Sequence, residues 1–338
     1  MARVCTVIAT SHSPFLYAPY EEWEPGRKTR LSRGGLSPET KVDPVEENAR
    51  KEARIHAAFD VLRERLKAAK PDVLLVFGDD QLEQFDFKNF PAFSLYTGES
   101  YSGYKISRLI GLPVAPGRKE REKTPDNWVT VKSNTDFSHA LLRELMADGF
   151  DLAFSNELPD PDEGMGHAFM RPLYYLDPDY RLPMVPFSVN CYYGPQPTGK
   201  RCYELGRAVR AAIERIPLDL NVAVIGSGGL WHLPNYPNSW IDEDFDQQIL
   251  AGIKSGDARK TAAYFDTVQL PYDPADAKSV KLASGGTGIL LGVGGGTGET
   301  RNWIVAAAVA DGKPGTVVDY IPIYASPIGV SWAYWDNI

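Results

Sequence analysis

The stretch that decides the fold is Val4–Pro14, with the sequence VCTVIATSHSP. Residues 4–10 form a short apolar run rich in β-branched side chains, which Ser11 and Pro14 break, and this pattern predicts a buried strand. The strand would deliver His12 to its carboxyl end, the edge of an open α/β sheet where ligands and chemistry collect. Histidine is a frequent metal ligand and the natural acid or base near neutral pH. A single histidine at this place would more often cap the strand, so its interpretation depends on the rest of the chain.

Length, charge and cysteine content bound the class of protein. The 338 residues suit one large α/β domain, and the net charge of −8 argues against nucleic-acid binding, which needs a basic face. No apolar run approaches the ~18 residues of a membrane-spanning helix, so we expect no membrane partner, and the N-terminal residues lack a signal-peptide pattern. The cysteines form no CxxC pair and predict free thiols in a reducing cytoplasm: Cys5, Cys191 and Cys202.

Strand patterns alternate with helical patterns along the chain, and this predicts an α/β fold: a three-layer α/β/α sandwich around a mixed central sheet, in one domain over residues 1–338. The polar, basic segment 17–44 is predicted as a lid or loop insertion, residues 90–132 as irregular, and Thr316–Ile323 as the closing strand. The other expected strands are Asp72–Phe77, Leu152–Ser155, Met184–Asn190 and Asn221–Ile225. The expected helices are Glu46–Lys70, Ser138–Asp148, Gly199–Arg215, Glu243–Lys254, Ala258–Phe265 and Ile304–Ala310.

The chain has five histidines, and three of them follow predicted strands among Gly, Pro or Ser: His12, His167 and His232. Histidines in such loops favour a site at one edge of the sheet. His56 and His139 lie inside helical patterns, where a surface or packing role is the default. Glycine-rich residues 284–298 lead to Glu299 at the start of a helix, although a helix N-terminus favours a carboxylate on its own account. The glycines match neither nucleotide-binding fingerprint, and no serine-hydrolase elbow occurs.

Short motifs recur in one order over nearly the whole chain. They are Met1-Ala-Arg-Val with Ser11-His12-x-Pro14, Asp72-Val with Asp80, His167 with Pro172-Leu173, Pro186-Phe-x-Val-Asn190, Pro197-x-Gly-Lys-Arg-Cys202, Asp219-Leu-Asn-Val222, Gly226-x-Gly-Gly-x-x-His232, Asp244-Phe-Asp246, and Gly298-Glu299 with Trp303. Through these motifs the chain resembles the class III (LigB-type) extradiol ring-cleavage dioxygenases. Many matches in one order are more specific than any single match.

The resemblance implies a mononuclear Fe(II) site with two histidines and one carboxylate, which leaves positions open for the substrate and O2. It implies that His12 is the first histidine ligand and Glu299 the carboxylate. It makes His232 the acid/base histidine and His167 a second active-site histidine that contacts substrate. The implied substrates are O2 and a small catechol-like ring, carboxylated or heteroaromatic. For the assembly we expect a homo-oligomer, with or without a small partner subunit, in the cytoplasm.

The family's second histidine ligand follows Asp in an Asn-Asp-His sequence, and here that place reads Asp79-Asp80-Gln81. A glutamine amide is a weaker iron ligand than imidazole. Gln81 could ligate through its carbonyl oxygen; alternatively Asp80, Asp79, or His56 reaching in from its helix could take the vacant place. Ligation by Asp or Gln would favour Fe(II) or Mn(II) over soft metals.

This departure leaves two other functions open. One is a metal-dependent hydrolase or lyase that acts on a small aromatic or carbonyl substrate without O2, through His12, Glu299 and His232. The other is a non-catalytic homologue in which the site has decayed. A carboxylated ring would suit the basic residues of the chain, although each alone is more often a surface residue: Arg27, Lys28, Arg30, Arg33, Lys200 and Arg201.

Overall fold

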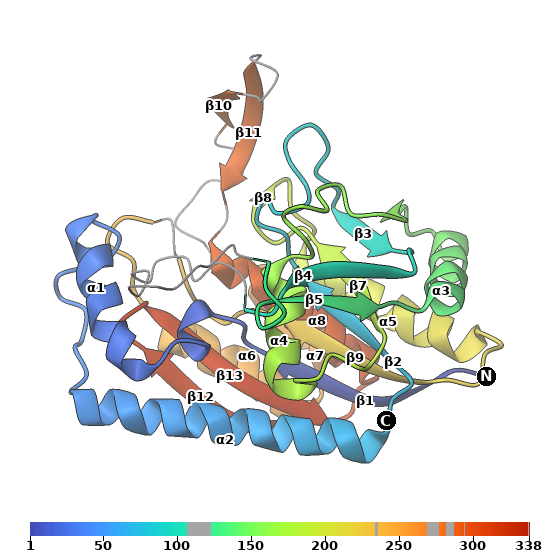
Figure 1. Ribbon diagram of the computed structural model, residues 1–338, viewed down its shortest axis with the longest axis horizontal. Coiled ribbons are helices and arrows are strands. Elements are labelled where there is room, and N and C mark those ends of the chain that lie inside the picture. Colours follow the sequence, from blue (N-terminus) through green and yellow to red (C-terminus); the bar gives the residue numbers. More distant parts are fainter. Residues whose placement is uncertain (107–122, 234–235, 269–276, 282–286, 294, 337) are drawn as a thin grey trace.

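The computed structural model describes residues 1–106, 123–233, 236–268, 277–281, 287–293, 295–336 and 338 (Figure 1). A mixed eight-stranded sheet crosses the molecule in the order β12-β13-β1-β9-β2-β7-β3-β6. Its four central strands, β1, β9, β2 and β7, run parallel to one another, whereas β13 pairs antiparallel with β1 at one side and β3 with β7 at the other. The bounds are β1 (Arg3–Thr10), β2 (Val73–Gly78), β3 (Phe93–Tyr96), β6 (Ala153–Ser155), β7 (Met184–Val189), β9 (Asn221–Ser227), β12 (Thr316–Ile323) and β13 (Ile328–Trp335).

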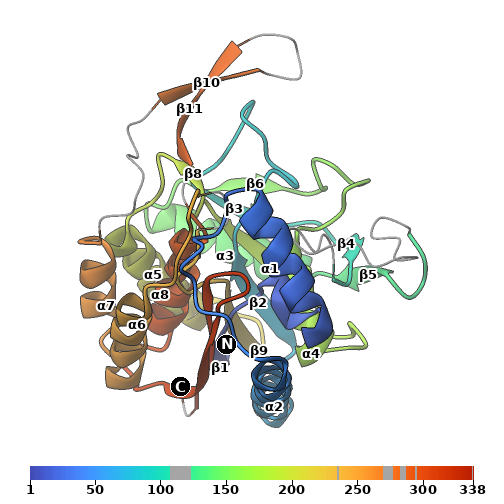
Figure 2. The same cartoon turned by 90° about the vertical axis from the view of Figure 1, so that its left-hand side faces the viewer.

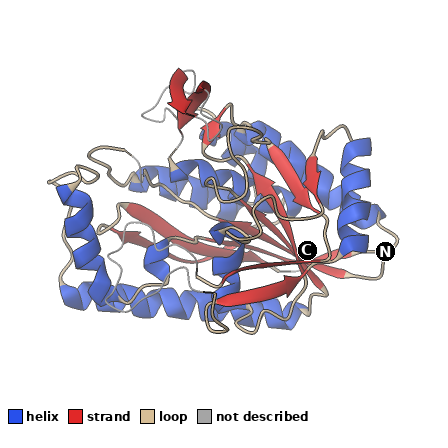
Figure 3. Ribbon diagram, turned by 45° about the horizontal axis from the view of Figure 1, so that its top comes forward, coloured by secondary structure: helices blue, strands red, loops and turns tan. Residues whose placement is uncertain are grey.

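Helices cover both faces of this sheet, as Figure 3 shows. One apolar layer joins the sheet to α2, α4 and the start of α1, and a second joins the other face to α3, α5, α6, α7 and α8. The bounds are α1 (Trp23–Ser32), α2 (Val45–Ala69), α3 (Thr135–Ala147), α4 (His167–Leu176), α5 (Gly199–Arg215), α6 (Glu243–Ser255), α7 (Ala258–Phe265) and α8 (Thr300–Val309). The predicted three-layer α/β/α class is therefore confirmed.

The central strands are continuous apolar runs because helices bury both of their faces. Every residue of β2 is buried, as is all of β9 after its first residue. Each parallel strand ends at the same edge of the sheet, and that edge carries polar side chains directly after β1 and β2 and, beyond a short glycine turn, after β9. The topology thus positions the candidate site.

Three segments differ from the sequence-based expectations. The segment predicted as a loop at 17–44 contains α1, which buried Trp23 anchors although Pro25 and Gly26 occupy the first turn, where proline is tolerated. Residues 90–132, predicted as irregular, contain β3 and the two-stranded sheet of β4 (Ser100–Tyr104) and β5 (Trp128–Lys132). After β12 the chain turns once more and adds β13 beside β1, so Thr316–Ile323 is not the last strand.

A second small sheet joins β8 (Tyr193–Gly194) to the hairpin of β10 (Ala277–Lys281) and β11 (Thr287–Val293). The hairpin projects away from the body of the molecule (Figure 2). Residues 284–286 and 294 of the predicted glycine-rich stretch lie outside the described residues. Among the helices that the structure describes, none has the length and apolar character needed to cross a bilayer.

Candidate metal centre

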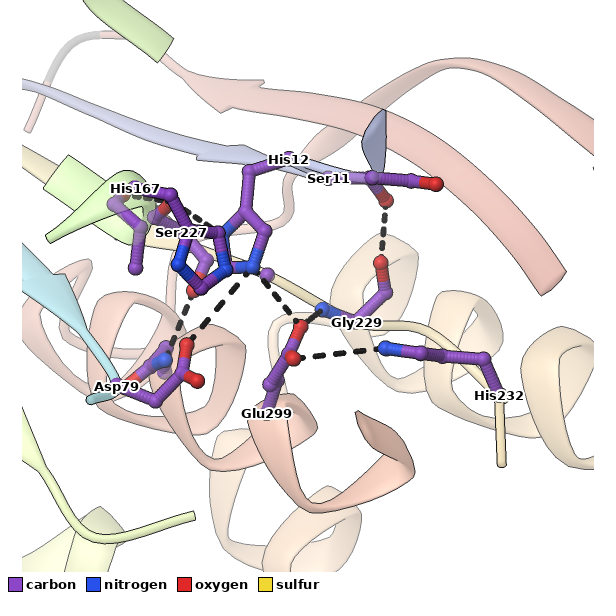
Figure 4. Close-up of polar contacts among 12 residues, drawn as sticks. Ser11, His12, Asp79, His167, Ser227, Gly229, His232 and Glu299 are labelled. Atoms are coloured by element: carbon purple, nitrogen blue, oxygen red, sulfur yellow. Dashed lines mark hydrogen bonds and ion pairs between the residues drawn. The ribbon is translucent and has the colours of Figure 1, made fainter. Parts of the chain in front are cut away.

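Five of the residues singled out in the sequence line one cleft of about 410 Å³: His12, Gln81, His167, His232 and Glu299. His12 and Gln81 follow β1 and β2, and His232 follows β9 after a short glycine turn. His167 is the first residue of α4 rather than a loop residue, and Glu299 ends a 3-10 turn that leads directly into α8. The carboxyl edge of the sheet therefore brings together side chains that lie far apart in the sequence (Figure 4).

The hydrogen bonds of His12 fix its tautomer. The Ser227 hydroxyl donates to the carbonyl oxygen of Ala168 at 2.5 Å, so it accepts from the Nδ1–H of His12 at 2.9 Å. The other ring nitrogen, Nε2, then carries a lone pair that faces the cleft. Burial lowers the pKa of His12 to about 4, and the neighbouring Glu299 offsets this only in part, so the ring is neutral at pH 7.

Two carboxylates face this lone pair. His12 Nε2 lies 3.4 Å from Glu299 Oε2 and 3.8 Å from Asp79 Oδ1, and the three atoms lie within 4.8 Å of one another. The Asp79 Oδ1 atom is buried and has no hydrogen-bond partner in the described part of the chain. Bonds of about 2.0–2.2 Å to one ion place ligand atoms roughly 3–4 Å apart, and both distances from His12 Nε2 lie in that range, so the group could hold a common cation.

Backbone and side-chain donors hold Glu299 in place. The Gly229 N–H donates to Oε2 at 2.7 Å and the Tyr192 hydroxyl donates to Oε1 at 2.8 Å. Gly228 has a φ of +122°, and a Cβ there would lie 2.6 Å from Glu299 Oε2, so only glycine lets the chain pass this carboxylate. Burial disfavours the ionised form, but the adjacent His12 and His232 rings lower the pKa of Glu299 well below its usual range.

Gln81 lies between the two carboxylates. Its amide nitrogen donates to Asp79 Oδ2 at 3.2 Å and to Glu299 Oε1 at 3.4 Å. Burial and the charge of Glu299 raise the pKa of Asp79 well above its usual value, as expected for a carboxyl group that shares a dry site with another. A divalent cation would reverse that effect because it stabilises the ionised carboxylate.

His232 also has one nitrogen committed to the backbone. Its Nδ1–H donates to the carbonyl oxygen of Leu230 at 3.0 Å, which leaves Nε2 in the cleft, 3.4 Å from Glu299 Oε1. Burial alone would lower the pKa of His232, but the Glu299 carboxylate raises it above its usual value. A Cβ at Gly296 would collide with this ring, so the glycine makes room for it.

His167 pairs with an acidic residue that the sequence analysis missed. Its Nδ1 lies 2.9 and 2.8 Å from the two oxygens of Glu83, and Glu83 also accepts from the backbone N–H of His167 at 3.0 Å. Burial would raise the pKa of Glu83, but the imidazole lowers it to about 2. Glu83 thus holds the Nδ1–H of His167 and leaves Nε2 free to face Gln81, 3.5 Å away.

Two other candidates for the third ligand do not join the cluster. His56 is exposed on α2, with its ring 5.7 Å from that of Tyr175, and does not line the cleft. Asp80 is buried, but its carboxylate caps a turn and accepts from the backbone N–H groups of Glu83, Gln84 and Phe85. Neither side chain faces His12 and Glu299, whereas the carboxylate of Asp79 does.

Comparison with known proteins identifies the family of the chain. Residues 7–324 match the family model described as the catalytic LigB subunit of aromatic ring-opening dioxygenase. This chain belongs to that family. The match includes every site residue described above, from His12 to Glu299, and it confirms the resemblance inferred from the motifs.

Known relatives of the LigB chain are similar at modest identity. It is 36% identical over 111 residues to a gallate dioxygenase of Pseudomonas putida, a match that covers 32% of this chain and only 31% of that protein. It is 27% identical over 282 residues to a 2,3-dihydroxyphenylpropionate/2,3-dihydroxicinnamic acid 1,2-dioxygenase of Photorhabdus laumondii, covering 76% and 81% of the two chains. A protein of the same name from Burkholderia vietnamiensis is 25% identical over 310 residues, covering 83% and 90%.

Proposed function

We propose that this LigB-family chain holds Fe(II) through His12, Asp79 and Glu299 and opens the ring of a catechol-like diol with O2. The observation that carries the proposal is the convergence of an imidazole lone pair and two carboxylate oxygens, one of them an unpartnered buried atom. Three acceptors that face one another in a dry site repel unless a cation lies between them. The family match supports the ring-opening reaction, and the names of the relatives support a hydroxylated aromatic substrate.

The donor set favours a hard or borderline divalent ion. One imidazole and two carboxylates suit Fe(II) or Mn(II), and neither thiolate nor thioether is present among the described residues that line the cleft. When bound, Fe(II) would supply coordination of the diol and of O2 and the transfer of electrons between these two substrates. Gln81 would then serve as a donor that ties the two carboxylates together rather than as the third ligand.

His232 is the acid/base in this proposal. A catechol must lose protons as it chelates a metal, and the Nε2 atom of His232 faces the cleft while Leu230 holds the other ring nitrogen. A ring oriented in this way can take a proton from a diol hydroxyl and later return it, a role worth roughly 10²–10⁴-fold in rate. Glu299 lies beside the imidazolium that this transfer produces and stabilises it.

His167 lies across the same cleft, with its ring centroid 4.8 Å from that of His12. The Glu83 carboxylate fixes its orientation, so its Nε2 atom can donate to or accept from a substrate oxygen. Arg171 supports the other side: its guanidinium donates to the backbone carbonyl oxygens of His12 and Ile106 at 3.1 and 2.7 Å. These contacts keep the ring-binding side chains in place before substrate arrives.

The test is to load the protein with Fe(II) under nitrogen and then measure O2 uptake on a panel of catechols, gallates and hydroxypyridones. We expect one Fe per chain and O2 uptake with at least one diol. His12→Ala and Glu299→Ala should lose both. Turnover of an aromatic substrate without O2 would favour the hydrolase or lyase instead, and a wild-type chain that binds no divalent metal would favour a non-catalytic homologue.

A further inference from the structure

One cation of the cleft has no partner among the described residues. Arg30, in the last turn of α1, lines the same cleft as the residues of the metal centre, and its Nε atom is buried without a hydrogen bond among the described residues. Burial lowers the pKa of Arg30, yet a guanidinium stays charged in proteins. A buried, unpaired charge is costly unless a ligand supplies the counter-charge.

The other basic residues of the predicted lid discussed in the sequence analysis are paired with a carboxylate or exposed to solvent. Arg27 pairs with Glu24 at 2.7 Å, and Lys28, on the same helix, lies 3.8 Å from the same carboxylate and is 72% exposed. Arg33 also lines the cleft but is exposed to solvent. Of the basic residues on α1, the half-buried Arg30 therefore combines a position in the cleft, a buried Nε atom and the absence of an ion pair among the described residues.

We propose that Arg30 binds a carboxylate carried on the aromatic ring of the substrate, so that the preferred substrates are catechol-type acids rather than neutral catechols. This inference rests on the proposed function, in which the metal centre binds the diol. The carboxylate of the same substrate would then lie at Arg30 of the predicted lid. A guanidinium matches a carboxylate with two parallel N–H···O bonds. Such a pair would supply the missing partner of the Nε atom.

The distribution of charge in the cleft favours this orientation of the ring. Asp79 and Glu299 lie together at the metal centre, so a substrate carboxylate is repelled from these two groups unless the metal binds it. Arg30 supplies positive charge to the lining of the cleft, near enough to His232 that it opposes protonation of that ring. A cleft of about 410 Å³ is large enough for one substituted ring.

The experiment compares dihydroxybenzoates with the matching dihydroxybenzamides, which keep the shape and remove the charge. Equilibrium binding is measured by calorimetry under nitrogen, with metal-free and Fe(II)-loaded protein, and steady-state turnover is measured in air. We expect wild-type protein to bind the acid roughly 10- to 100-fold more tightly than the amide, the range expected for a hydrogen-bonded charge pair. Arg30→Gln should remove this preference, raise KM for the acid and leave kcat nearly unchanged.

Two variants control for the fold and for the charge of α1. Lys28→Gln removes a charge from the same helix outside the cleft and should keep the preference for the acid, whereas Arg30→Lys should keep part of it. Equal binding of acid and amide by wild-type protein, or a preference that survives Arg30→Gln, would overturn the proposal. A chain that binds the acid through Arg30 but opens no diol would instead contradict the proposed function.

Discussion

Ser227→Ala tests whether the tautomer of His12 sets the affinity of the metal centre. In the structure the Ser227 hydroxyl donates to Ala168 and accepts from His12 Nδ1–H. Removing the hydroxyl leaves the buried Nδ1–H of His12 without a hydrogen-bond acceptor. It also permits the other tautomer of His12, in which Nε2 carries the proton and cannot bind a metal. We expect the affinity for Fe(II) to fall roughly 10- to 100-fold, the usual effect of removing a group that orients a ligand histidine.

A second, independent quantity is the loss in the free energy of unfolding of the metal-free Ser227→Ala protein. A buried donor left without a partner costs about 1–3 kcal/mol, so urea unfolding in the presence of a chelator should show a loss of that size. Metal affinity is measured under nitrogen by competition with a chromophoric chelator. The two readouts together separate a weakened ligand from a general loss of folding.

Ser138→Ala is the matched control for Ser227→Ala. Ser138 is a fully buried serine of α3 whose hydroxyl donates to the Thr135 carbonyl oxygen, and it is not among the residues that line the cleft. We expect it to leave the affinity for Fe(II) unchanged and to cost less stability than Ser227→Ala, because the Thr135 carbonyl oxygen lies within the helix and keeps a backbone partner. If Ser227→Ala binds Fe(II) as tightly as wild-type protein, the tautomer argument for His12 is refuted.

Asp79→Asn keeps the size of the side chain and removes its charge, so elemental analysis after gel filtration should find well under one metal per chain. Full occupancy would indicate that Gln81, rather than Asp79, is the third ligand. Gln81→His should raise the affinity for Fe(II) because imidazole is the stronger ligand, and a lower affinity would count against its position beside the metal. His232→Gln should keep its metal and its melting temperature while kcat falls roughly 10²–10⁴-fold; unchanged turnover would exclude the acid/base role. Burial raises the pKa of Asp246 to about 7, so the folded chain keeps a proton that the unfolded chain loses near pH 4. The free energy of unfolding should therefore fall by up to about 4 kcal/mol as the pH rises from 4 to 7. Asp246→Asn should remove this part of the slope in urea unfolding, and an unchanged slope would place the titration elsewhere.

The sheet and most of the site could be predicted because they depend on local patterns. Continuous apolar runs mark the central parallel strands, and the carboxyl ends of parallel strands meet at one edge, which is why His12, Gln81 and His232 converge. The exposure of His56 was also within reach of the sequence. The apolar stripe of α2 runs through Ile55, Phe59, Leu62 and Leu66, and His56 lies off that stripe.

Other features depend on contacts between distant residues. Glu83 pairs with His167 across 84 positions, and no spacing rule links the two. Asp79 and Asp80 are neighbours of the same type, and only the turn that follows decides that Asp80 caps backbone N–H groups while Asp79 faces His12. Helix α1 forms where proline and glycine predict a loop, because Trp23 is buried in the layer between α2 and the sheet.

The central claim is that this LigB-family chain inserts both atoms of O2 into an aromatic diol at a metal held by His12, Asp79 and Glu299. The most direct measurement is a single turnover of the Fe(II)-loaded protein under ¹⁸O2, followed by mass spectrometry of the ring-opened product. We predict that the product carries two ¹⁸O atoms and that Asp79→Asn yields none of it. A product that contains no oxygen from O2, or full labelling by the Asp79→Asn protein, would contradict the claim.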